Sequence, residues 1–294
     1  MRNILCPLVC GLVVYSTLTI QNRTIVYSER KVLAYEVEMN MKVQSINELR
    51  DSQGLRIVLV AGAPSPWGQA AKAMMEYKGL DYAAGLMMAG AANEEVVNWA
   101  GVNSGPIVAW NDERPIDRWT DILFLIERLA PEPALIPEKA QDRADLFGLS
   151  HELNGELGMG WNRRLLMFAP VVESGDAPEA IANMSAKYKY NKHDCDRATD
   201  RIISVLGLLD ERLEAQKARG SSYFIGNNPT ALDFYWTAFS ILIDLMPFDK
   251  IPLAKELQPL FTQNDPAIKS AFTPSLCEHR DRFFDQYFKS PMEF

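Results

Sequence analysis

Hydrophobic and polar positions follow two different patterns between residues 55 and 130. Leu55–Ala61 (LRIVLVA) is a continuous apolar run rich in β-branched residues, which is typical of a buried strand. Residues 119–129 (WTDILFLIERL) instead repeat apolar positions at helical spacing, which predicts an amphipathic helix. The pattern between them predicts, in order, a helix opened by Pro66 and ended by Gly79, a strand at 81–88, a helix at 93–99 capped by Asn93, a strand at 107–110 and a return strand at 114–116.

The second half of the chain shows helical spacing and no convincing strand. A proline-rich stretch at 131–140 separates it from the first half and reads as an extended linker. Helices are predicted at 141–167, 195–219 and 228–246, with a loop and a short helix at 168–191 and two or three short helices after 247. Strands and helices followed by helices alone predict an α/β domain at 55–130 and an all-helical domain at 141–294.

Residues 1–54 are predicted to be an N-terminal extension. Arg2 precedes an apolar stretch at 4–20, an order typical of a signal sequence or anchor. The alternative is a disordered or mis-assigned extension, with Met39 or Met41 as the true start. We expect a cytoplasmic protein, or a secreted or membrane-anchored one if the stretch at 4–20 is real.

Composition narrows the class of protein. The chain has 294 residues, of which 48% are hydrophobic and 23% charged, as in globular proteins. A net charge of −8 argues against a nucleic-acid partner, because phosphate binding needs clustered Lys and Arg. No CxxC and no zinc spacing occurs, so no metal is expected. We expect the three histidines to be surface or satisfied core residues rather than bases; they are His151, His193 and His279.

Three segments carry a family resemblance, in the order the family has them. The first runs from Ser65-Pro66-Trp67-Gly68-Gln69 to Lys78-Gly79-Leu80-Asp81-Tyr82, the second is Ser104-Gly105-Pro106-Ile107-Val108, and the third is Thr230-Ala231-Leu232-Asp233. Over about residues 55–240 the chain resembles glutathione transferases, and the first segment resembles their serine-type classes, tau and theta among them. The resemblance implies a thioredoxin-like N-terminal domain and an all-helical C-terminal domain.

The first segment implies a role for Ser65. In the serine-type classes this hydroxyl and the helix start stabilise the thiolate of glutathione, which makes more nucleophile at neutral pH. The alternative for Ser65 is a simple helix cap, the commoner role of a serine before a helix.

The second and third segments imply a backbone contact and a structural box. Pro106 would follow a cis peptide bond, so that the Gly105 backbone pairs with the cysteinyl part of glutathione. Gly105 replaces the valine-like residue usual in the family. Thr230 and Asp233 match the family's capping box, which supports the fold and carries no catalysis.

One family motif is missing. Glu/Gln-Ser normally precedes the third helix, whereas this chain reads Asp117-Arg118-Trp119-Thr120-Asp121. Thr120 could supply the hydroxyl and Arg118 could pair with a carboxylate. Alternatively, Thr120 only caps the helix and the charges face solvent. The expected glutathione-binding residues are therefore Trp67, Gly105, Pro106, Ile107, Arg118 and Thr120.

The resemblance implies a glutathione S-transferase with glutathione as co-substrate, conjugated to a small apolar electrophile or used as cofactor in lyase or isomerase chemistry on one. It also implies a homodimer active in detoxification. Ser65 would be its catalytic residue. The alternative is a non-catalytic binding or scaffold protein of the same fold. A thiol–disulfide reductase is disfavoured because neither Ser65 nor Gly68 is a cysteine. The stretch Trp161-Asn162-Arg163-Arg164 could line an acceptor pocket or be an ordinary helix surface.

Overall fold

The structure is a computed structural model that describes residues 15–20, 23–28, 31–38 and 41–294. The first three ranges are strands β1 (Tyr15–Ile20), β2 (Arg23–Ser28) and β3 (Lys31–Glu38), which form an antiparallel sheet in that order. The structure has strands where a disordered extension is one of the alternatives predicted, and their many β-branched residues favour extended backbone. Residues 4–14 of the predicted signal or anchor, with Cys6 and Cys10, lie outside the described residues, as does Met39.

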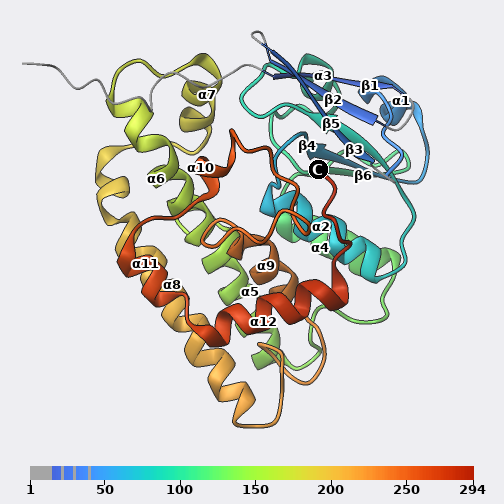
Figure 1. Cartoon of the computed structure of the whole chain (residues 1–294). Coiled ribbons are helices and arrows are strands. Elements are labelled where there is room, and N and C mark those ends of the chain that lie inside the picture. Colours follow the sequence, from blue (N-terminus) through green and yellow to red (C-terminus); the bar gives the residue numbers. More distant parts are fainter. Residues whose placement is uncertain (1–14, 21–22, 29–30, 39–40) are drawn as a thin grey trace, which may run out of the picture.

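A second three-stranded sheet forms the core of the α/β part (Figure 1). Its central strand β4 (Leu55–Val60) pairs in parallel with β5 (Tyr82–Met87) and antiparallel with β6 (Ile107–Trp110). Ile57 and Leu59 belong to the large core on one face, while Val58 belongs to a smaller core on the other. Burial of both faces explains why this strand is a continuous apolar run.

Helices cover both faces of this sheet. The larger core includes α2 (Pro66–Tyr77) and α4 (Trp119–Leu129), and the smaller core includes α1 (Ile46–Asp51) and α3 (Glu94–Ala100). Helix α1 lies in the segment assigned from the sequence to the extension, yet Ile46 and Leu49 are buried against the sheet. The expected return strand at 114–116 is reduced to a single bridge between Val108 and Ile116.

The second half of the chain is helical, as predicted, but its boundaries differ. The helix expected at 141–167 is two helices, α5 (Ala140–Asn154) and α6 (Met159–Glu173). Backbone packs tightly at the break: a Cβ on Gly155 or Gly158 would lie 2.7 or 2.8 Å from the His151 carbonyl oxygen. Helix α6 continues through Pro170, past the expected end. The remaining helices are α7 (Glu179–Lys187), α8 (Lys192–Lys217), α9 (Ala231–Ser240), α10 (Gln258–Phe261), α11 (Pro266–Ala271) and α12 (Pro274–Tyr287).

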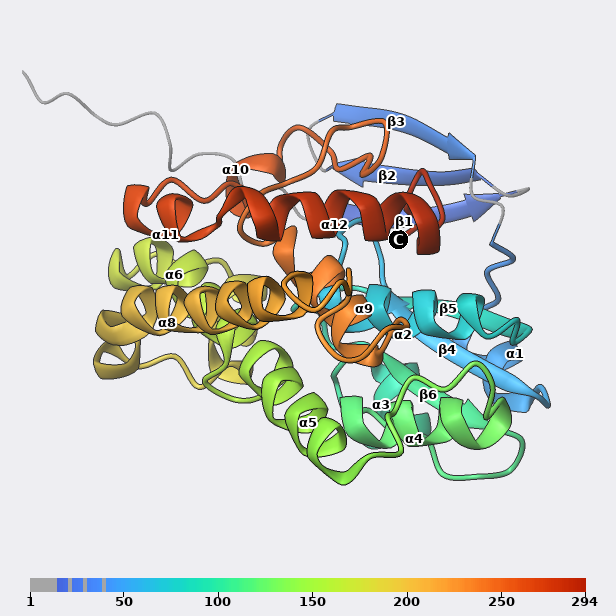
Figure 2. The ribbon, with the colours of Figure 1, turned by 90° about the horizontal axis from the view of Figure 1, so that it is seen from below.

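Helix α9 lies at the centre of the helical part (Figure 2). All of its residues are buried. It contacts α2 of the α/β part as well as α5 and α12, so it joins the two halves. The predicted capping box at its start is confirmed. The N–H and the hydroxyl of Thr230 both donate to Asp233 Oδ2 at 2.9 Å.

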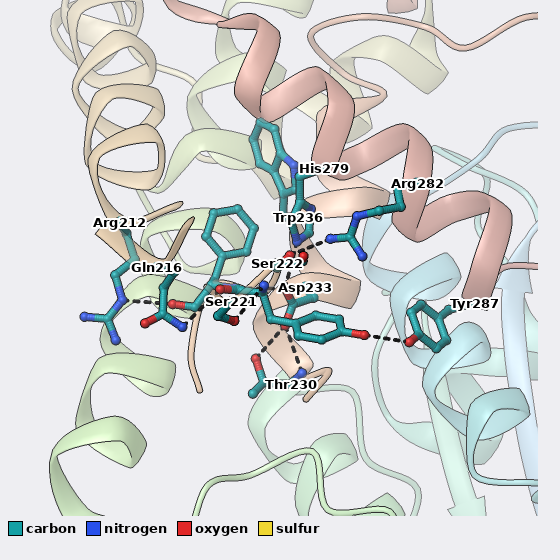
Figure 3. Close-up of polar contacts among 12 residues, drawn as sticks. Arg212, Gln216, Ser221, Ser222, Thr230, Asp233, Trp236, His279, Arg282 and Tyr287 are labelled. Atoms are coloured by element: carbon teal, nitrogen blue, oxygen red, sulfur yellow. Dashed lines mark hydrogen bonds and ion pairs between the residues drawn. The ribbon is translucent and has the colours of Figure 1, made fainter. Parts of the chain in front are cut away.

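Asp233 also holds the C-terminal helix in place (Figure 3). Its Oδ1 accepts from the Phe224 N–H at 3.1 Å and lies 2.9 Å from His279 Nε2, on α12. Both side chains are fully buried. His279 is therefore a core histidine with a structural partner, as expected from the sequence.

Within the described residues, no helix combines the length and the apolar character needed to cross a bilayer.

Candidate functional site

The start of α2 is the first feature of the candidate site. Ser65 occupies the N-cap position, with an extended backbone, and Pro66 takes the first helical position as predicted. The Ser65 hydroxyl makes no capping hydrogen bond in the described structure. The first N–H groups of a helix have no intrahelical acceptor. This helix start therefore presents a half-exposed hydroxyl and unsatisfied donors, a combination that suits an anion.

The Gly105–Pro106 peptide bond lies beside this helix start. It is cis, as predicted. A Cβ on Gly68, in the first turn of α2, would lie 4.0 Å from Pro106 Cβ, so the two segments nearly touch. The N–H and carbonyl of Gly105 make no backbone hydrogen bond with the rest of the described chain. They are free to pair with an extended peptide, as a sheet edge does.

Gly105 lacks the valine-like side chain usual in the family, and the Met87 side chain lies close to that space. A Cβ at this position would lie 3.1 Å from Met87 Sδ and 3.4 Å from Val60 Cγ2. The Met87 side chain thus occupies part of the space where a valine-like residue would begin.

Trp67 lies between the two halves of the molecule rather than on an open surface. Its Nε1 donates to the Asn154 carbonyl at 3.0 Å, and its ring packs edge-on against Phe239 at 4.7 Å. With Pro106 and Asp117 it lines a cavity of about 10 Å³, which has room for no more than one water. A tripeptide would have to lie over this point and not inside it.

The other predicted binding residues are spread around the start of α4. The Ile107 side chain is fully buried in the smaller core, so only its backbone could meet a ligand. Arg118 is the exposed N-cap of α4, and no carboxylate in the described structure pairs with it. Thr120, in the first turn, makes one long contact of 3.5 Å with Asp121 Oδ1. Asp117 reaches the cavity beside Pro106.

Helix α7 brings in residues that sequence reasoning missed. Asn183 Nδ2 donates to the Gly90 carbonyl in the α/β part at 2.9 Å, so α7 spans the junction of the two halves. Its last residue, Lys187, and the following Tyr188 approach Arg164 of α6. Tyr188 also contacts Trp67, with ring centroids 6.0 Å apart. No local motif marks Lys187 or Tyr188, because the cluster depends on how α7 packs.

Charge in this cluster is positive and poorly compensated. The pKa of Lys187 is lowered to about 8, first by desolvation and then by the Arg164 guanidinium, and Asp117 partly opposes this. Lys187 as a residue stays exposed, so its ammonium group lies at a crowded surface. Burial raises the pKa of Tyr188, and the neighbouring Arg164 works against that rise.

No group of three or more His, Cys, Asp and Glu side chains among the described residues has the arrangement of a metal site. The two described cysteines, Cys195 and Cys277, are free thiols, and burial raises the pKa of each.

Comparison with known proteins identifies the fold. No protein-family model and no curated protein matches the sequence. Solved structures do match. A glutathione S-transferase from Methylobacterium radiotolerans, in complex with glutathione sulfonate, aligns over 82% of this chain and 96% of its own, with a TM-score of 0.56 and 14% identity.

Two further structures align over a similar length. A glutathione S-transferase from Methylobacillus flagellatus with glutathione bound gives a TM-score of 0.54 and 13% identity over 82% of this chain and 100% of its own. A glutathione transferase family member from Pseudomonas fluorescens, with two glutathione molecules bound, gives a TM-score of 0.53 and 16% identity. That alignment covers 84% of this chain and 98% of the Pseudomonas chain. The chain therefore has the glutathione-transferase fold, a thioredoxin-like α/β domain followed by an all-helical domain.

Proposed function

We propose that the chain is a glutathione S-transferase in which Ser65 is the catalytic residue. The observation that carries the proposal is the start of α2, where the Ser65 hydroxyl is not used as a cap and lies beside the cis Gly105–Pro106 bond. Donors at a helix start favour an anion, and a thiolate is the reactive form of glutathione. Relatives of the same fold with glutathione or its sulfonate bound support this choice of co-substrate.

The residues present fit glutathione at the thiol end of the tripeptide. The unpaired backbone of Gly105 would hold the cysteinyl segment, and Ser65 would donate to its sulfur. Arg118 and Thr120 at the start of α4 would hold the γ-glutamyl end, where the family's usual motif is replaced. With the thiolate formed, the chain would conjugate glutathione to a small electrophile.

The direct test is retention on immobilised glutathione together with conjugation of chlorodinitrobenzene. Ser65→Ala is expected to lower kcat/KM by a factor of roughly 10² to 10³, the range for loss of one donor to a developing anion. It is also expected to raise the pKa of bound glutathione, measured by thiolate absorbance. Full activity in this variant would remove the mechanism.

Ser45→Ala is a matched control for the Ser65 test. Ser45 is also an N-cap serine, but its side chain does accept from the Glu48 N–H and forms a capping box. Its loss is expected to cost about 1 kcal/mol of stability and to leave kcat unchanged.

The second candidate is a non-catalytic binding protein of this fold. It is favoured by Asp117, an acidic side chain at the predicted glutathione site, and by the small size of the cavity that Asp117 lines. Titration calorimetry separates the two, because millimolar or absent affinity for glutathione in a folded sample supports the binding protein.

We also infer that the chain forms a homodimer. Phe124 on α4 is 45% exposed and stacks on Phe147 of α5, next to a hollow of about 300 Å³ along β6. Light scattering on the purified protein tests this, and a monomer at micromolar concentration would contradict it.

A further inference from the structure

Two adjacent arginines on α6 are buried to a similar degree but are satisfied very differently. Arg163 donates to three carbonyl groups: Nε to Leu242 at 2.9 Å, and Nη2 to Leu260 and Thr262 at 3.1 and 3.3 Å. Those bonds anchor α6 to the segment after α9 and explain the residue structurally.

Arg164 makes contacts that leave its charge uncompensated: its guanidinium carbon lies 5.6 Å from the centroid of the Phe261 ring, and its side chain interacts with the Tyr188 hydroxyl. It is 8% exposed, and no carboxylate of the described structure lies within salt-bridge distance. Its Nε is buried without a hydrogen-bond partner, and its Nη1 donates to the Met167 thioether at 3.3 Å. A thioether is a weak acceptor. None of these contacts supplies a negative charge, and a buried cation without one is costly, so an anionic ligand would stabilise Arg164.

Lys187 adds a second cation to the same place. Its Nζ lies 5.8 Å from the centroid of the Tyr188 ring, which adjoins Arg164, and Asp117 makes no ion pair with it in the described structure. Two like charges brought together at the end of α7 oppose the packing of that helix. A ligand carboxylate between them would offset this repulsion and could accept two bonds from a guanidinium.

Aromatic rings adjoin this cluster on the side of the nucleophile. Tyr188, beside Arg164, has its ring centroid 5.0 Å from that of Trp161 and 6.0 Å from that of Trp67. Trp67 is two residues from Ser65 and packs at the junction of the two halves. A flat unsaturated group would therefore lie near the proposed thiolate with its anionic end toward α6 and α7.

We propose that Arg164 and Lys187 form an anion subsite that selects an acceptor carrying a carboxylate next to a flat, unsaturated electrophilic carbon. The inference rests on the proposed function and replaces the purely apolar electrophile expected from the sequence.

The experiment compares matched pairs of ligands. Conjugation is measured with chlorodinitrobenzene and with chlorodinitrobenzoate, and binding is measured with dinitrobenzene and dinitrobenzoate by quenching of tryptophan fluorescence without glutathione. The wild-type chain is expected to favour the carboxylated member of each pair by roughly tenfold, the effect of one charge-assisted hydrogen bond.

Lys187→Gln is the informative variant, because this residue is exposed and its replacement leaves the core intact. It is expected to remove most of the carboxylate preference, and Lys187→Arg to keep it. The matched control is Lys189→Gln, which removes the same charge two residues away, where the ammonium lies 2.7 Å from Glu156 Oε1. The control is expected to keep the preference.

The outcomes separate this inference from the proposed function. If conjugation depends on Ser65 but shows no preference for the carboxylated acceptor, the anion subsite is wrong and the proposed transferase function stands. If dinitrobenzoate binds more tightly than dinitrobenzene, Lys187→Gln abolishes that preference and no conjugation is detected, the anion subsite stands and the proposed transferase function is wrong. If Lys187→Gln raises KM for glutathione instead, the cations serve the tripeptide and the acceptor assignment is wrong.

Discussion

Asp233→Ala tests the idea that one buried carboxyl group holds three segments of the helical domain together. Asp233 is 0% exposed and takes hydrogen bonds from the N–H of Phe224, the N–H and hydroxyl of Thr230, and Nε2 of His279 (Figure 3). These groups lie before α9, at its start and on α12. Alanine removes the acceptor for all of them at once.

The size of the effect follows from the donors left behind. The Thr230 hydroxyl can turn to another acceptor, so three donors remain unpaired, each costing about 1–3 kcal/mol. Water entering the small space left by the carboxyl group offsets part of this. We therefore expect a loss of about 3–5 kcal/mol in the free energy of unfolding, well above a typical single substitution.

Urea unfolding followed by circular dichroism measures this loss, with Asp265→Ala as the control. Asp265 is also an N-cap aspartate, accepting from the N–H groups of Ala267 and Ile268, but it caps a short peripheral helix. Its removal is expected to cost about 1 kcal/mol. Equal losses in the two variants would refute the view that Asp233 is a buried centre and would reduce it to an ordinary cap.

Three further predictions concern the site and its surroundings. The preference for a carboxylated ligand is expected to be full below pH 8 and to fall above it, because Lys187, with its pKa lowered to about 8, loses its charge there. The affinity for dinitrobenzoate, measured as a function of pH, checks this, and an affinity that does not change with pH contradicts it. Gly105→Val is expected to cost about 1–3 kcal/mol by crowding Met87, and Met87→Ala should recover part of that cost in the double variant; strictly additive losses in urea unfolding would argue against the contact. Glu293→Gln is expected to destabilise by about 1–2 kcal/mol, because its carboxylate lies 3.6 Å from the buried Lys72 ammonium, and an unchanged unfolding midpoint would count against it.

Local periodicity explains which parts of the fold could be predicted. The helix at 119–129 has purely helical spacing of its apolar residues, and the strand that begins at Leu55 is a continuous apolar run. The structure places both as expected. The capping box at Thr230 and the start at Pro66 were also readable, because their chemistry is complete within four residues.

Features that depend on close packing of backbone or on side-chain hydrogen bonds could not be predicted from the sequence. The break between α5 and α6 follows from backbone packing at Gly155 and Gly158 against the preceding turn, which one-dimensional spacing does not reveal. Asn93 begins α3 as predicted, but its side chain bonds Met88 and Ala91 instead of capping the helix. In both cases the deciding contacts join residues two to seven positions apart, and hydrophobic spacing carries no signal for them.

The same distinction runs through the site. Ser65, Gly105 and Pro106 belong to the thioredoxin-like domain, and their predicted roles follow from motifs that are short and continuous. Arg164 and Lys187 lie on different helices of the other domain, and only packing brings them together. In the proposed function, the first set would hold the thiolate of glutathione. The second set varies with the packing of α7, so acceptor selectivity in this chain should change through substitutions in α7 while the chemistry at Ser65 is kept.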